Sequence, residues 1–121
     1  MTAQVGTLNA DSLLDSAREH SSGRATQVFK AEGDGILSNV VIALTEGNGL
    51  SQHSNPGEAL LTVLQGRVRL STDTAAWELG QWEQVSIPQA LHELIALADS
   101  VVILTIAKLP RPEHIGMPGI H

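Results

Sequence analysis

Short runs of alternating hydrophobic and polar residues dominate the chain after residue 23. In one such run Arg67 and Arg69 alternate with Val68 and Leu70, which predicts a strand with one solvated and one buried face. Turn residues separate the runs at regular spacing, a pattern typical of an all-β sandwich or barrel. The expected strands cover residues 24–30, 36–45, 59–64, 67–71, 75–79, 84–87, 92–96 and 100–109.

The connections between these runs carry recognisable turn signals. Residues 32–35 and 46–49 are rich in glycine with acidic or amide residues, as is typical of turns. The runs at 59–64 and 67–71 are separated by Gln65 and Gly66, which is short enough for a tight hairpin. The sequence therefore predicts that these two strands pair with each other.

Residues 9–20 show the apolar spacing of a short helix. Asn9, Asp11 or Ser12 can cap its first amide groups, and basic residues lie near its end. Its narrow apolar stripe is sufficient to dock on a sheet and consists of Leu13, Leu14 and Ala17. We predict three parts: an N-terminal segment with this helix at 1–23, a β-barrel at 24–109 and a Pro- and Gly-rich tail at 110–121.

The run at 101–107 is apolar at every position except Thr105, whereas only one face of a strand in a small antiparallel barrel can meet the core. Its other face needs a cover, either the N-terminal helix or a second subunit. Leu60 and Leu64 are also expected to face outward. These features predict a homodimer.

Composition narrows the class of protein. At 121 residues the chain has the size of one domain that folds without disulfides, and it contains no cysteine. A net charge of −6, with two tryptophans and one phenylalanine as its aromatic residues, provides neither a basic stripe nor a base-stacking platform, which argues against nucleic acid as a partner. No signal-like or membrane-length apolar segment is present, so we expect a cytoplasmic protein without a membrane partner.

Candidate chemistry is concentrated in residues 47–66. His53 and Asn55 are two apart, so on an extended segment they share one face, and the alternation continues through Ala59, Leu61 and Val63. We expect this face to be the barrel interior. Glu58 is one residue out of this register and is expected to face the other way.

The same segment resembles the first sequence motif of the cupin superfamily, in which a glycine precedes His-x-His, a glutamate and a second glycine. Gly47, His53 and Gly66 fall on this pattern. Asn55 stands where the motif has its second histidine, and Ala59 stands where it has the glutamate.

Residues 80–107 resemble the second cupin motif, with Gly80, Pro88 and His92 on the pattern and Ala90 in place of a customary glycine. Together the two motifs imply a small single-domain cupin, with a double-stranded β-helix or jelly-roll barrel. In metal-bearing cupins three histidines and a glutamate hold iron, manganese, zinc, nickel or a similar ion, and imidazole suits these metals.

Two of those four ligands are present here, as His53 and His92. Three alternatives stay open: a tight site that adds the Asn55 amide, a weak divalent transition-metal site, and no metal. A catalytic metal centre generally needs at least three protein ligands.

Two functions are therefore predicted. The first is a small-molecule-binding barrel lined by Leu61 and Val63, with His53, Asn55 and His92 orienting the ligand. The second is a cupin enzyme, an oxygenase, isomerase or lyase, working through the depleted metal site. Trp77 and Trp82 are interpreted as packing residues.

Overall fold

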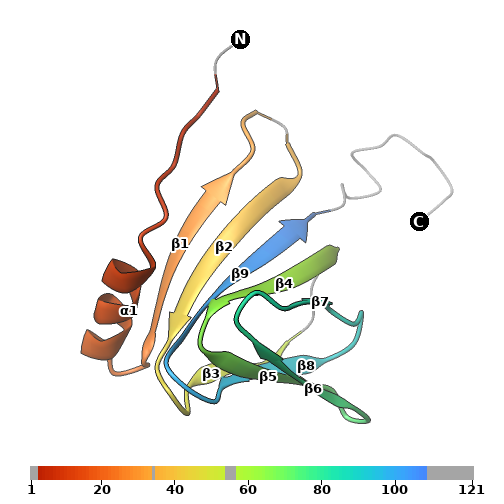
Figure 1. Cartoon of the computed structure of the whole chain (residues 1–121). Coiled ribbons are helices and arrows are strands. Elements are labelled where there is room, and N and C mark those ends of the chain that lie inside the picture. Colours follow the sequence, from red (N-terminus) through yellow and green to blue (C-terminus); the bar gives the residue numbers. More distant parts are fainter. Residues whose placement is uncertain (1–2, 34, 54–56, 109–121) are drawn as a thin grey trace, which may run out of the picture.

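The computed structural model describes residues 3–33, 35–53 and 57–108, with residues 52 and 53 described by their backbone. The expected tail at 110–121 and Asn55 lie outside the described residues. The elements, shown in Figure 1, are α1 (Ala10–Glu19), β1 (Arg24–Lys30), β2 (Leu37–Leu44), β3 (Gly49–His53), β4 (Glu58–Gln65), β5 (Arg67–Ser71), β6 (Ala76–Gly80), β7 (Gln84–Ser86), β8 (His92–Ala96) and β9 (Ser100–Ala107).

The strands form two antiparallel sheets that lie face to face. The large sheet has the order β1-β2-β9-β4-β7, and the small sheet has the order β3-β8-β5-β6. In Figure 1 the large sheet lies above the small sheet, and α1 stands beside β1. This arrangement confirms the predicted jelly-roll barrel.

Alternation along the strands builds the core between the two sheets. On β4, Ala59, Leu61 and Val63 are buried, whereas Glu58 and Leu60 are exposed. β5 alternates in the same way, as its sequence predicts. The core is completed by Ile42, Leu44, Val68, Leu70, Leu79, Ile87, Leu94, Ala96, Val102 and Leu104.

The predicted hairpin between β4 and β5 is wrong. β4 pairs with β7 and β9, whereas β5 pairs with β6 and β8. Gly66 instead makes a corner at which the chain passes from the large sheet to the small one. Its φ of 87° is in the left-handed region, and a Cβ here would collide with the side chain of Ser100 and the carbonyl oxygen of Asp99.

The helix α1 covers part of the outer face of the large sheet. Asn9 caps it by accepting a hydrogen bond from the Ser12 amide at 3.0 Å. Leu14 and Ala17 are buried against the sheet, where they form a second core with Val41, Ala43 and Val101. The helix therefore covers the first half of the two-faced strand β9.

On the other half of this outer face, the segment before α1 lies against β1, where Gly6 approaches the Phe29 ring, but among the described residues no such cover reaches Leu60 on β4. Leu64 packs with the helix cluster, but Leu60 is 47% exposed. A cleft of about 420 Å³ lies here, lined by Leu37, Glu58, Ala59, Leu60, Ser86, Ile87, Gln89, Thr105 and Ala107. None of the described residues belongs to a helix that is long and apolar enough to cross a membrane.

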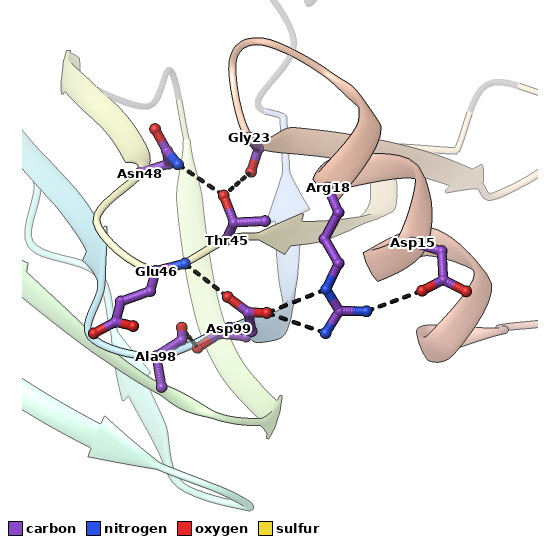
Figure 2. A network of polar contacts seen from close by, with 9 residues as sticks. Asp15, Arg18, Gly23, Thr45, Glu46, Asn48, Ala98 and Asp99 are labelled. Atoms are coloured by element: carbon purple, nitrogen blue, oxygen red, sulfur yellow. Dashed lines mark hydrogen bonds and ion pairs between the residues drawn. The ribbon is translucent and has the colours of Figure 1, made fainter.

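Asp99 joins α1 to the turn before β3 (Figure 2). Its Oδ1 accepts a hydrogen bond from the Glu46 amide at 2.9 Å, and its Oδ2 accepts from Nε and Nη2 of Arg18 at 3.2 and 3.0 Å. Arg18 also donates to Asp15 at 2.9 Å. These contacts hold the pKa of the Asp99 carboxyl below its ordinary value, with the Glu46 amide as the largest cause and Arg18 next.

We expect Asp99→Asn to lower the Tm at pH 7 by about 3–5 °C. Because the pKa of Asp99 is lower in the folded chain than in the unfolded one, the carboxylate stabilises the fold above its unfolded pKa. This contribution is lost as the pH falls below about 4. Thermal unfolding between pH 7 and pH 2 should therefore show a flatter pH dependence for Asp99→Asn than for the parent. Asp73→Asn, at an exposed aspartate, is the control, and a parent-like slope for Asp99→Asn would contradict this role.

Candidate functional site

One end of the barrel, which we call the mouth, brings together the ends of both sheets. Register places Glu58 beside Ala107 in the large sheet and His53 beside His92 in the small sheet. The connections into β4 and β8 also meet here, because Nε2 of Gln89 donates a hydrogen bond to the Gly57 carbonyl at 3.0 Å. The two cupin-like motifs thus converge on the mouth.

His92 is a buried polar residue at the mouth. It begins β8, where it alternates inward with Leu94 and Ala96, and its exposed fraction is 2%. The alternation that buries these aliphatic neighbours therefore also directs the imidazole into the barrel. Buried polar groups need hydrogen-bond partners. Burial of this imidazole therefore costs free energy unless its ring nitrogens are hydrogen-bonded.

A backbone contact fixes the orientation of the His92 ring. Its Nδ1 lies 2.8 Å from the carbonyl oxygen of Ala90. Since a carbonyl oxygen only accepts, Nδ1 carries the proton, and in the neutral ring Nε2 bears the lone pair. Nε2 is thus the acceptor atom of the ring.

His53 reaches its position through a register shift. Leu50 pairs with Leu94, and the next pair is His53 with His92. The two pairs are three residues apart on β3 but two residues apart on β8. Such a shift is characteristic of a β-bulge. Without it, simple alternation from Leu50 would place position 53 on the opposite face of the sheet from Leu50.

The large sheet brings no carboxylate to this interior. Ala59, at the glutamate position of the motif, is 5% exposed and buried in the core, and its carbonyl accepts from the Ile87 amide. Glu58 is exposed on the outer face. The expected register of these two residues is therefore confirmed, and the alternation predicted from residue 53 onward is interrupted by the passage from the small sheet to the large one.

The barrel interior next to His92 is nearly filled. A void of about 10 Å³ remains, close to the room that one water needs. Val63 is fully buried in the core. The void is lined by Ile42, Leu50, Leu61, Leu70, Ile87, His92, Leu94 and Leu104.

Among the side chains that the structure describes, the donor set does not fit a tight metal centre. Aliphatic side chains and one imidazole surround the void, and the position that would supply a carboxylate is Ala59. Within the part of the chain that the structure describes, no group of three or more His, Cys, Asp or Glu residues is placed to hold a metal ion.

Both tryptophans were predicted to be packing residues, but they differ in strand position and in exposure. Trp77 pairs with Leu70, a core residue, whereas Trp82 follows β6 in a turn and is 71% exposed. The alternation of Trp77 with Glu78 and Leu79 carries this signal, because residues two apart on a strand share a face. Trp77 is therefore a residue near the site that the motifs alone do not identify.

No protein-family model and no curated protein matches the sequence. Solved structures do match. SPY1581, a conserved protein of unknown function from Streptococcus pyogenes, has a TM-score of 0.68 at 19% identity, over 91% of this chain and 93% of that one. KdgF from a Halomonas species has a TM-score of 0.64 at 20% identity, over 80% and 93%. An RmlC-like cupin from Desulfovibrio desulfuricans has a TM-score of 0.57 at 23% identity, over 68% and 81%.

Proposed function

Because the chain has the cupin fold, we propose that it is a small-molecule-binding barrel whose ligand sits at the mouth against the imidazole of His92. The observation that carries this proposal is the buried, oriented His92 ring within an otherwise aliphatic lining. One oriented polar group in apolar surroundings is the usual composition of a small-ligand site. The void of about 10 Å³ leaves no room for an organic molecule deeper in the barrel, which favours binding at the mouth.

In this proposal His53 and Asn55 join His92 in orienting the ligand, and Leu61 and Val63 belong to the apolar wall and its support. Leu61 borders the void beside His92. Val63 lies one inward position further along β4. Its contribution is therefore to the shape of the wall.

Metal binding, in the same proposal, is weak or absent. Two imidazoles and one neutral amide are a poor set for iron, manganese, zinc or nickel, all of which are usually held by three or more nitrogen or carboxylate ligands. A divalent ion at His53 and His92 would exchange readily with solvent. We propose that ligand binding does not require it.

The second candidate is a metal-dependent cupin enzyme, an oxygenase, isomerase or lyase. One observation favours it: the register shift in β3 places His53 directly across from His92. If a metal binds, His53 and His92 would hold it, and it would supply Lewis-acid or redox chemistry at the mouth. The chain would then contribute ring orientation, through the contact between His92 and the Ala90 carbonyl.

The binding proposal is tested by following the imidazole signals of His92 by NMR while small neutral organic fragments are added to metal-free protein. We expect saturable shifts of the His92 ring signals, and a loss of fragment affinity of about tenfold or more in His92→Gln. His20→Gln, at an exposed histidine of the helix cap, is the control. Fragments that bind only after a transition metal is added would favour the enzyme instead.

A further inference from the structure

Trp77 lies on the inner face of the small sheet. On β6, Leu79 is buried in the core and Glu78 is exposed. Trp77 is two residues before Leu79, so both side chains share a face. Its cross-strand partner on β5 is Leu70, which borders the void beside His92. Partners in an antiparallel pair lie on the same face, and both relationships therefore place the indole inside.

The same side chain is partly open to solvent. Trp77 is 39% exposed, although its partner Leu70 is fully buried. β6 and β7 are the last strands of their sheets, so no further strand covers the indole. The next pair along β5 and β6 is Ser71 with Ala76, and Ser71 also pairs with Glu93, the neighbour of His92. Trp77 is thus an inward-facing, partly exposed aromatic side chain near the level of His92.

Trp82 provides the contrast within the same chain. It lies in the turn after β6 with a φ of 68°, and its amide donates to the carbonyl of Val63 at 2.7 Å. Val63 lies toward the far end of β4 from Glu58 at the mouth. Trp82 is therefore remote from the mouth and serves as an internal control for any aromatic effect.

No Asp, Glu, Lys or Arg side chain is buried among the described residues. Among the described residues the buried polar side chains are His92 and Ser100. Ser100 is engaged at the opposite end of the barrel, where it accepts from the Arg67 amide at 3.0 Å and donates to the Ala98 carbonyl at 2.7 Å. Among the described residues, a ligand that reaches between the two sheets beside His92 and Trp77 therefore meets an imidazole, an indole and aliphatic groups. A net charge on the ligand would be desolvated without a compensating partner.

We infer that Trp77 is a ligand-contacting platform at the mouth and that the ligand is an uncharged, planar or aromatic small molecule. The ligand stacks on the exposed part of the indole, beside the imidazole of His92. Aromatic side chains favour planar partners through offset or edge-to-face contacts. This inference rests on the proposed binding function and adds the specificity-determining residue and the ligand class.

Fluorescence of full-length single-tryptophan variants tests it, because the chain contains two tryptophans. Trp82→Phe leaves Trp77 as the sole emitter, and Trp77→Phe leaves Trp82. The probes are benzyl alcohol and its charged counterparts benzoate and benzylammonium, which have a similar shape. We expect benzyl alcohol to change Trp77 emission saturably at roughly millimolar concentration. We also expect its affinity to exceed that of each charged probe by about tenfold or more, and Trp82 emission to stay constant.

The His92 ring signals in the same titrations separate the two proposals. Trp77→Leu should bind benzyl alcohol about tenfold more weakly than the parent, and Trp77→Phe, which keeps a ring, should bind with intermediate affinity. If the His92 signals shift while Trp77 emission stays flat and Trp77→Leu binds like the parent, the platform is refuted and the binding function stands. Equal affinities for charged and neutral probes would refute the ligand class. If neither the His92 ring signals nor Trp77 emission changes, the platform and the binding function are both refuted.

Discussion

The double variant Asn55→His with Ala59→Glu should bind Zn²⁺, Mn²⁺ or Ni²⁺ at least about a hundredfold more tightly than the parent chain. The two changes add an imidazole and a carboxylate to the two histidines already present. Ala59 is buried on the inner face of β4. Isothermal titration calorimetry of metal-free protein measures the gain.

The Tm of the double variant should change in opposite directions without metal and with metal. Without metal, the new carboxylate is desolvated at a position that is 5% exposed for alanine, and the Tm should fall. At a metal concentration one hundred times Kd, the bound ion should restore about 2.7 kcal/mol, or roughly 10 °C. The same double variant carrying His92→Ala is the control and should lose the gain. A folded double variant with parent-like metal affinity would show that the interior site is not where we place it.

A charge on the uncovered outer face should separate the subunits of the proposed homodimer. Leu60 is 47% exposed in the cleft beside Leu37, on the half of the large sheet that α1 leaves open. A two-fold pair would cover this cleft in both copies, and a stable pair needs burial of more than about 1,000 Å². We expect Leu60→Glu to weaken self-association by about a hundredfold or more, because a carboxylate would be desolvated in the interface.

Analytical ultracentrifugation at micromolar concentration measures this effect. Ile95→Glu is the matched control, because Ile95 is similarly exposed at 39% but pairs with Arg69 on the small sheet. The parent and Ile95→Glu should sediment as dimers, and Leu60→Glu as a monomer. A monomeric parent would remove the interface, and equal effects of the two substitutions would move it away from the cleft.

Local alternation explains how much of the fold the sequence predicts. The strands at 24–30, 67–71 and 92–96 have the expected limits, because each has one buried face and the period of its pattern follows directly from strand geometry. The inward direction of Ala59 and the outward direction of Glu58 follow from the same rule. The helix cap at Asn9 could also be predicted, because it depends on a hydrogen bond between residues only three apart.

Pairing between distant strands explains what the sequence did not predict. The short connection at Gly66 has the length of a hairpin, yet β4 and β5 belong to different sheets. The backbone of β4 pairs with β9, and that of β5 pairs with β8 instead. The register shift between Leu50 and His53 likewise depends on β8, about forty residues away in sequence. Local patterns contain no information about these partners.

The candidate site is predicted in part for the same reason. The position of His92 follows from its alternation with Leu94, whereas its tautomer depends on the loop that presents the Ala90 carbonyl. Trp77 becomes a site residue only because β6 and β7 are the last strands of their sheets. Edge position is a property of topology, and hydrophobicity patterns do not encode it.

The most direct measurement of the central claim is the metal content of the parent protein, purified without a histidine tag and analysed by element-resolved mass spectrometry. The account predicts far less than one transition-metal ion per chain, because two imidazoles and a neutral amide, with the buried Ala59 in place of a carboxylate, provide too few donors. After brief exposure to Zn²⁺, Mn²⁺ or Ni²⁺ and gel filtration, the content should remain low. One tightly held ion per chain that is lost in His92→Gln would contradict the account and establish a metal centre at the mouth.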